Sequence, residues 1–195
     1  MSTASPSRQS RLHAAVGDTV VCAAHGVGRV VAHVQNQVGG TERDCVVIDL
    51  AAGLRITLPL QEVAGRLRAV ADESELEDVR STLASPPSRR DKPWTKRIKE
   101  SKAKLAAGRA SELAEVVRHG DHFERTANGV QLSYAERRVY LQARTLLLRE
   151  LSAARGIAEG EAGAWIEAQL ALPKENRNAS VQLDTCDAMP KKGGR

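Results

Sequence analysis

Apolar residues follow two different periods along the chain, and the change falls near residue 70. Before that point, short runs rich in Val, Ile and Leu are separated by glycine turns. Five such runs at close spacing predict a small five-stranded β-barrel of the SH3 or Tudor type. The predicted strands cover residues 19–22, 27–34, 44–50, 54–59 and 66–70. A period of two places Arg29 and His33 on the same side of the second strand.

Beyond residue 70 the apolar positions recur at helical spacing, and local signals divide them into about five helices. An acidic run opens the first helix, and a Pro-Pro pair ends it. We expect Ser111 to cap a third helix, and Ser133 with Glu136 forms an S-x-x-E capping box. Gly108 and Gly156 are typical of C-terminal caps. The second part of the chain is therefore predicted to be an all-α bundle.

The fold class that follows is α+β with more than one domain. We expect a disordered tail over residues 1–12, the barrel over 13–70, the helical domain over 71–172 and a second disordered tail over 173–195.

Residues 89–104 form the most basic stretch, with eight basic and two acidic residues in a protein whose net charge is only +5. Trp94 lies within it, although only 3% of the chain is aromatic. In the predicted helix, Lys92, Lys96 and Lys99 share one face. Basic side chains gain affinity by neutralising phosphates, and an apolar wedge can enter the minor groove. The stretch therefore predicts a DNA-binding surface.

Two plainer interpretations of this stretch stay open. Trp94 and Ile98 are spaced i, i+4, and such apolar pairs usually pack in a core. A run of charge is usually a solvated helix face. The excess of one sign favours DNA over both interpretations. Trp165 has no basic flank, so we expect it in the core.

Several function classes find no support in the sequence. No apolar run approaches the roughly 20 residues of a membrane span, and the first ten residues lack a signal-peptide centre. The three cysteines have no metal-ligand spacing, so we expect reduced thiols in a cytoplasmic protein. No phosphate loop or G-x-S-x-G motif is present. We therefore expect neither an enzyme nor a bound cofactor or metal.

Several motifs together resemble the CarD/CdnL family of bacterial RNA polymerase-binding transcription regulators. They are VGDTVV at 16–21, HGVGRV at 25–30, PWTKRIK at 93–99 and LSYAER at 132–137. The first two motifs also occur in the polymerase-interacting module of transcription-repair coupling factors. The tryptophan motif followed by this helical order makes the resemblance specific.

The resemblance implies a DNA contact at the upstream edge of the melted promoter. There the family's tryptophan wedges into the minor groove and favours the open complex. Carried over by residue, Trp94 is the wedge, and the predicted phosphate contacts are Lys92, Lys96, Arg97, Lys99 and Lys102.

The resemblance also implies that the N-terminal module binds the β subunit of RNA polymerase. Arginines that meet this subunit in the family align near Asn36 and Thr57, which are not arginines. Arg55 lies two residues from Thr57, hence on the same strand face, and is a candidate substitute. Arg29 completes the predicted polymerase-binding set.

Two further functions stay open beside this one. The first is a protein–protein adaptor that uses the barrel alone and would show no steep salt dependence of DNA affinity. A helix-turn-helix repressor would need a base-reading recognition helix, which neither 111–124 nor 134–155 clearly offers. For the favoured function we expect a cytoplasmic, nucleoid-associated monomer.

Overall fold

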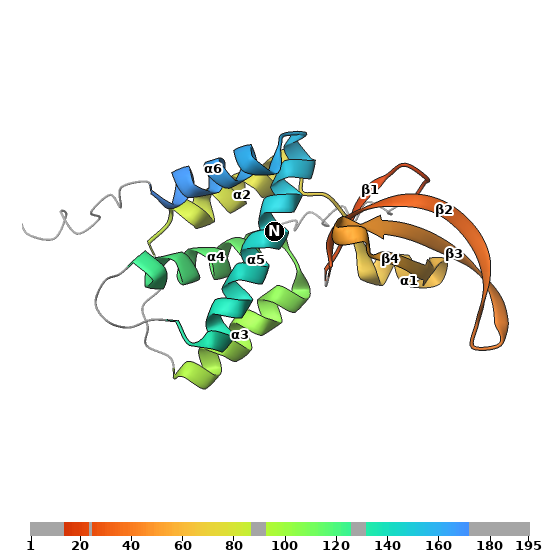
Figure 1. Ribbon diagram of the computed structural model, residues 1–195, viewed down its shortest axis with the longest axis horizontal. Coiled ribbons are helices and arrows are strands. Elements are labelled where there is room, and N and C mark those ends of the chain that lie inside the picture. The colour runs from red at the N-terminus through yellow and green to blue at the C-terminus, as the bar shows by residue number, and fades with distance from the viewer. Residues whose placement is uncertain (1–13, 24, 87–92, 126–131, 172–195) are drawn as a thin grey trace, which may run out of the picture.

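The computed structural model describes residues 14–23, 25–86, 93–125 and 132–171, and they form a curved sheet beside a helical bundle (Figure 1). The predicted α+β fold class is confirmed. The two predicted tails and Lys92 lie outside the described residues. Cys22 and Cys45 are buried free thiols, as expected.

The described part of the N-terminal module forms one antiparallel sheet with the strand order β4-β3-β2-β1-β5. The strands are β1 (Thr19–Cys22), β2 (Gly26–Val38), β3 (Thr41–Leu50), β4 (Arg55–Pro59) and β5 (Leu67–Ala69). All five strands were predicted, but β2 and β3 are longer than expected. Helix α1 (Leu60–Arg66), which was not predicted, joins the two edge strands and contributes Val63 to the core.

A β-bulge in β2 corrects one prediction. The register of β2 against β3 shifts between Val30 and Ala32, so one extra residue interrupts the alternation of side chains. Arg29 consequently lies on the face away from the core, whereas His33 pairs with the core residue Val46. The expectation that Arg29 and His33 share a side was wrong, because a period of two holds only along a regular strand.

Among the described residues, five helices form the second module. They are α2 (Glu73–Ala84), α3 (Trp94–Ala107), α4 (Ala110–Arg125), α5 (Tyr134–Arg155) and α6 (Glu159–Leu170). Helix α5 packs against α3, α4 and α6 and so forms the centre of the bundle. Helix α4 begins at Ala110, so Ser111 lies in its first turn rather than at its cap.

Two predicted helix caps and two predicted core positions of the bundle are confirmed. Gly108 and Gly156 end α3 and α5 in the left-handed conformation, with φ of 65° and 63°. Ile98 is buried in the bundle core. Trp165 is partly buried against the same core, and the Arg155 guanidinium lies 4.7 Å from the centre of its ring.

A buried ion pair joins the two modules. Arg68 of β5 donates from Nη2 to Glu150 Oε2 of α5 at 2.7 Å, and from the same nitrogen to the Gly108 carbonyl at 2.6 Å. The backbone N–H of Ala71 donates to Glu150 Oε1 at 3.2 Å. A Cβ on Gly108 would lie 2.6 Å from the Ala23 Cα, so the end of α3 meets β1 only because this residue is glycine. The sheet and the bundle are thus held at defined positions.

Candidate functional site

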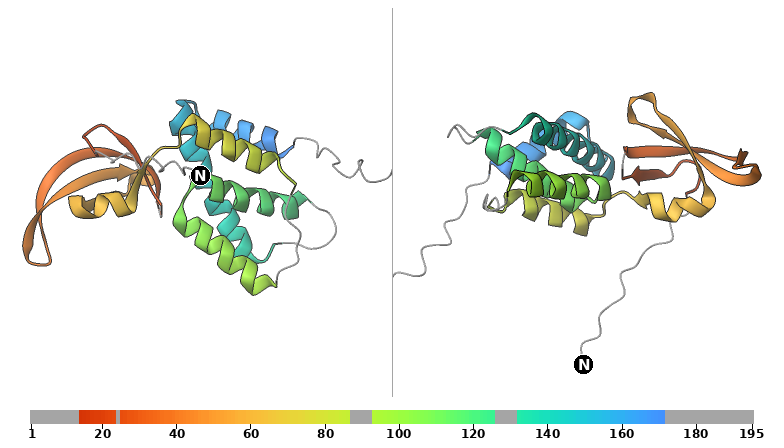
Figure 2. Two further views of the ribbon diagram at one scale, coloured as in Figure 1. Left: turned by 180° about the vertical axis from the view of Figure 1, so that it is seen from behind. Right: turned by 90° about the horizontal axis from the view of Figure 1, so that it is seen from below.

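Trp94 is the first residue of α3 and lies at the end of this helix that is farther from the sheet (Figures 1 and 2). Its side chain is 46% exposed. Its indole Nε1 donates a hydrogen bond to Ser133 Oγ at 3.1 Å. The ring therefore projects from the bundle, as predicted, but it is also fixed to the neighbouring helix start.

Ser133 belongs to a polar network that links the starts of α3 and α5. Its hydroxyl caps α5 by accepting from the Glu136 backbone N–H at 3.3 Å and donates to Glu136 Oε2 at 2.8 Å. The predicted capping box is thus confirmed. Glu136 Oε1 in turn accepts from Arg97 Nη2 at 2.9 Å. Trp94 is oriented by a side chain that is itself held in place.

The charge of Glu136 depends on this network. Burial on its own would raise the pKa of the carboxyl group. The hydrogen bonds from Ser133 and the Arg97 guanidinium outweigh burial and hold the pKa of Glu136 below its ordinary value. The carboxylate is therefore ionised at neutral pH and neutralises Arg97.

The structure separates the predicted phosphate contacts into two groups. Lys96, Lys99 and Lys102 are exposed on α3. The side chain of Arg97 is only 12% exposed, and that of its partner Glu136 is 11% exposed. Arg97 thus fastens α3 to α5. The structure does not test the predicted contact of Arg97 with phosphate. Its side chain is mostly buried, whereas those of the three lysines are exposed.

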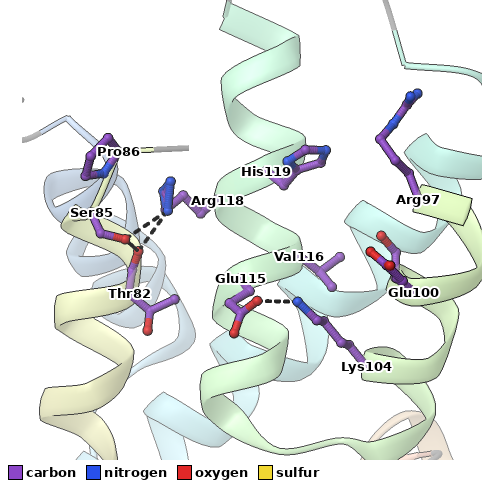
Figure 3. Close-up of a pocket in the computed structure, with 11 residues that line it drawn as sticks. Thr82, Ser85, Pro86, Arg97, Glu100, Lys104, Glu115, Val116, Arg118 and His119 are labelled. Carbon is purple, nitrogen blue, oxygen red and sulfur yellow. Dashed lines mark hydrogen bonds and ion pairs between the residues drawn. The ribbon is translucent and has the colours of Figure 1, made fainter. Parts of the chain in front are cut away.

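A cavity of about 410 Å³ lies beside this site, between α2, α3 and α4 (Figure 3). Lys104 of α3 pairs across it with Glu115 of α4. Arg118 donates from Nη1 to Ser85 Oγ at 2.9 Å. Burial lowers the pKa of Arg118, although the charge of Glu115 opposes the change. Its Nε and Nη2 are buried without a hydrogen-bond partner among the described residues. The basic residues here therefore serve packing between helices.

The predicted polymerase-binding residues lie on one face of the sheet. Residues paired across antiparallel strands share a face. Arg29 and Arg55 both pair with Asp49, and Thr57 pairs with Val47 two positions away on β3. Asn36 pairs with Arg43, which has the same parity along β3. All four candidates therefore lie opposite the core, whose β3 residues are Val46, Ile48 and Leu50.

Arg55 is held in a fixed orientation on this face. Its Nε and Nη2 donate to the two carboxylate oxygens of Asp49 at 2.5 and 2.8 Å. The hydrogen bond from Arg55 lowers the pKa of Asp49. The guanidinium group stays exposed, so the pair stabilises the fold little and mainly orients the arginine.

Sequence reasoning missed the pairing partners in these networks. Arg97 and Glu136 are 39 positions apart, and Arg68 and Glu150 are 82 positions apart. One signal was present: Glu150 occupies a position in the apolar period of α5, where a charged residue must be paired.

The described residues hold neither a candidate metal site nor a candidate membrane span. No group of three or more His, Cys, Asp or Glu side chains among these residues is placed to hold a metal ion. No helix in the same ranges is long and apolar enough to cross a membrane.

Two family models match the chain. Residues 15–71 match the CarD-like/TRCF RID domain, and residues 78–167 match the CarD C-terminal domain. The first match ends between β5 and α2, where the sheet module ends, and the second begins within α2. Together the two matches cover about three-quarters of the sequence. The chain belongs to the CarD/CdnL family of non-enzymatic, RNA polymerase-interacting transcription regulators.

Proposed function

We propose that this protein stabilises the open promoter complex. It binds the RNA polymerase β subunit through the outer face of its sheet and the upstream edge of the melted DNA through α3. Trp94 enters the minor groove as a wedge. The observation that carries the proposal is a 46%-exposed tryptophan, fixed by a hydrogen bond at a helix start, with exposed lysines on the same helix.

The energetics suit a wedge that acts only on distorted DNA. Unstacking a base step costs a few kcal/mol, and this cost is lower where the DNA is already opening. A ligand shifts an equilibrium by its differential affinity for the two states. A tenfold longer-lived open complex needs about 1.4 kcal/mol, which one aromatic contact and a few phosphate contacts supply. Because Ser133 already orients Trp94, little ordering of the indole opposes binding.

Tethering to polymerase supplies the rest of the affinity. Lys96, Lys99 and Lys102 give only a few phosphate contacts, so binding to free DNA is weak. A polymerase-bound sheet module raises the effective concentration of the bundle at the promoter. This effect depends on geometry. The 14 residues of α3 span about 21 Å, and the helix ends against β1 and β5 at Gly108. Trp94 is thus carried about one helix length from the junction.

The polymerase contact is assigned to the face that carries Arg29, Asn36, Arg55 and Thr57. Arg55 offers a guanidinium group already oriented by Asp49. Asp49 uses Nε and one hydrogen of Nη2, so the N–H groups of Nη1 and the second hydrogen of Nη2 can donate to a carboxylate or a carbonyl pair on a partner. We propose that Arg55 replaces the arginines that are absent at Asn36 and Thr57.

The testing experiment is the lifetime of the open complex with purified polymerase. Wild type should lengthen it, and Trp94→Ala should lose most of the effect while keeping polymerase binding. Trp165→Phe is the matched control, because it changes the other tryptophan at a site away from α3. In a polymerase-binding assay run beside it, Arg55→Ala should lose binding, whereas Arg66→Ala should keep it, because Arg66 is an exposed arginine paired with Glu62 on α1. Equal lifetimes with wild type and Trp94→Ala would contradict the wedge.

An adaptor that binds polymerase without touching DNA is the second candidate. The ion pairs of Arg97 and Lys104 favour it, because they neutralise two cations of the basic stretch. The two candidates differ in salt dependence. A DNA contact predicts that affinity for promoter DNA falls steeply with salt, and that Lys99→Ala reduces the slope by about one. An adaptor predicts no such slope. In either case we propose a monomer without enzymatic activity that works in the cytoplasm, at the nucleoid.

A further inference from the structure

Tyr134 is the most exposed large apolar or aromatic side chain in the described ranges, at 85%. It is the first residue of α5 and follows the cap Ser133, whose hydroxyl accepts from Trp94. The starts of α3 and α5 lie side by side in both orientations of the ribbon (Figures 1 and 2). Two aromatic residues thus occupy adjacent helix starts, and both are displayed to solvent.

The charge around Tyr134 favours an anionic partner. The nearby carboxylates are neutralised: Glu136 pairs with Arg97, and Glu124 pairs with Arg137 at 3.0 Å. Arg138, one turn after Tyr134 on the same face of α5, is exposed. Aromatic rings beside an exposed arginine suit nucleic acid better than an apolar protein surface.

We infer that Tyr134 is a second aromatic DNA contact, which acts beside Trp94 on the same promoter segment. The inference rests on the proposed function. The ring packs against the sugar edge of the minor groove next to the step that Trp94 enters, and the phenol O–H donates to a phosphate oxygen. The inferred DNA contact thus comprises two aromatic side chains, Trp94 and Tyr134, on either side of Ser133, rather than one tryptophan.

Leu141, on the solvent face of α5, distinguishes a protein partner from DNA. Tyr134, Arg138 and Leu141 are spaced i, i+4 and i+7, and Leu141 is 50% exposed. A protein docked along this helix would use the whole stripe. DNA at the start of α5 would use Tyr134 but not Leu141, which lies about 10 Å further along the axis.

The experiment compares open-complex lifetimes for full-length wild type, Trp94→Ala, Tyr134→Ala, Tyr134→Phe and Leu141→Ala. Far-UV circular dichroism melts first establish that each variant is folded. Tyr134→Ala is expected to shorten the lifetime at least about fivefold, because it removes a whole aromatic contact. Tyr134→Phe should retain more of the effect than Tyr134→Ala, and Leu141→Ala should behave as wild type.

The outcomes separate this inference from the proposed function. If Trp94→Ala shortens the lifetime and Tyr134→Ala does not, the inference is overturned while the wedge stands. If neither variant has an effect, the proposed function fails as well. If Leu141→Ala is as defective as Tyr134→Ala, the face of α5 docks a protein, and the inference is again overturned.

Discussion

The ion pair between the modules makes a strong prediction about stability. Glu150 is 2% exposed and accepts hydrogen bonds from Arg68 and from the Ala71 backbone. Replacing one partner of a buried pair costs about 3–5 kcal/mol, because the other is left uncompensated. In Glu150→Ala the remaining Arg68 side chain is already 28% exposed and regains water. We therefore expect a loss of about 3 kcal/mol, at the lower end of that range.

The reverse substitution should be worse. In the part of the chain that the structure describes, Arg68→Ala leaves the buried Glu150 carboxylate with the Ala71 N–H as its remaining partner. The loss of unfolding free energy should approach about 5 kcal/mol, the upper end of the range. In the double variant no unpaired charge remains, so the double loss should be smaller than the two single losses added. The coupling energy should be about 1–3 kcal/mol, as is typical of residues in one network.

The assay is urea unfolding of the full chain for the four proteins of this cycle, followed by far-UV circular dichroism. Glu77→Ala is the matched control, because Glu77 and Arg80 form an exposed pair on α2. It should leave stability nearly unchanged. Open-complex lifetimes should also fall in Glu150→Ala, since the bundle would no longer be held at a fixed distance from polymerase.

Two results would refute this reasoning. One is a coupling energy below about 0.5 kcal/mol, which would mean that Arg68 and Glu150 act independently. The other is an Arg68→Ala variant that is more stable than Glu150→Ala. The first result would mean that the orientation of the modules depends on packing at Gly108 rather than on the ion pair, and the second that the unpaired arginine costs more than the unpaired carboxylate.

Two further predictions concern the frame that orients Trp94. Ser133→Ala should lower the free energy of unfolding by about 1 kcal/mol through loss of the cap, and it should also shorten the open-complex lifetime. Asp72→Ala, which removes the capping box of α2, should lower the free energy of unfolding by a similar amount but leave the lifetime unchanged. Because the network holds the pKa of Glu136 below its ordinary value, the ionised form contributes stability that is fully present above that ordinary value and is lost as the pH falls through the lowered pKa. In a Trp165→Phe background, the fluorescence of Trp94 should therefore change on acidification below about pH 4.5. Glu136→Gln should abolish that transition. If the transition survives in Glu136→Gln, another group causes it.

The fold was predictable where its signals are local. The capping box of α5 and the glycine caps of α3 and α5 each depend on residues within one turn, so they could be identified from spacing alone. Helix α1 was missed because its seven residues contain one glycine and only one buried side chain, Val63, so no period emerges. The bulge in β2 was missed because nothing in its apolar sequence marks the extra residue.

The candidate site was predictable in composition but not in the roles of its cations. Eight basic residues in one stretch predict affinity for phosphate, whichever of them make contact. Whether a given arginine reaches outward depends on a carboxylate that is distant in sequence. Arg97 meets Glu136, while Lys99, two residues further along the same helix, is exposed. A helical wheel of α3 alone does not contain that information.

A wedge residue must combine exposure with a fixed orientation, and these two requirements oppose each other. A side chain displayed to solvent usually keeps its rotamer freedom, and ordering it on binding costs free energy. Here the indole N–H is fixed by Ser133, Ser133 by Glu136, and Glu136 by Arg97, while the ring stays half exposed. Arg97 does not face the proposed DNA surface, yet through Glu136 and Ser133 it can contribute more to the proposed DNA contact than another exposed lysine. It reduces the ordering cost of Trp94, the proposed wedge.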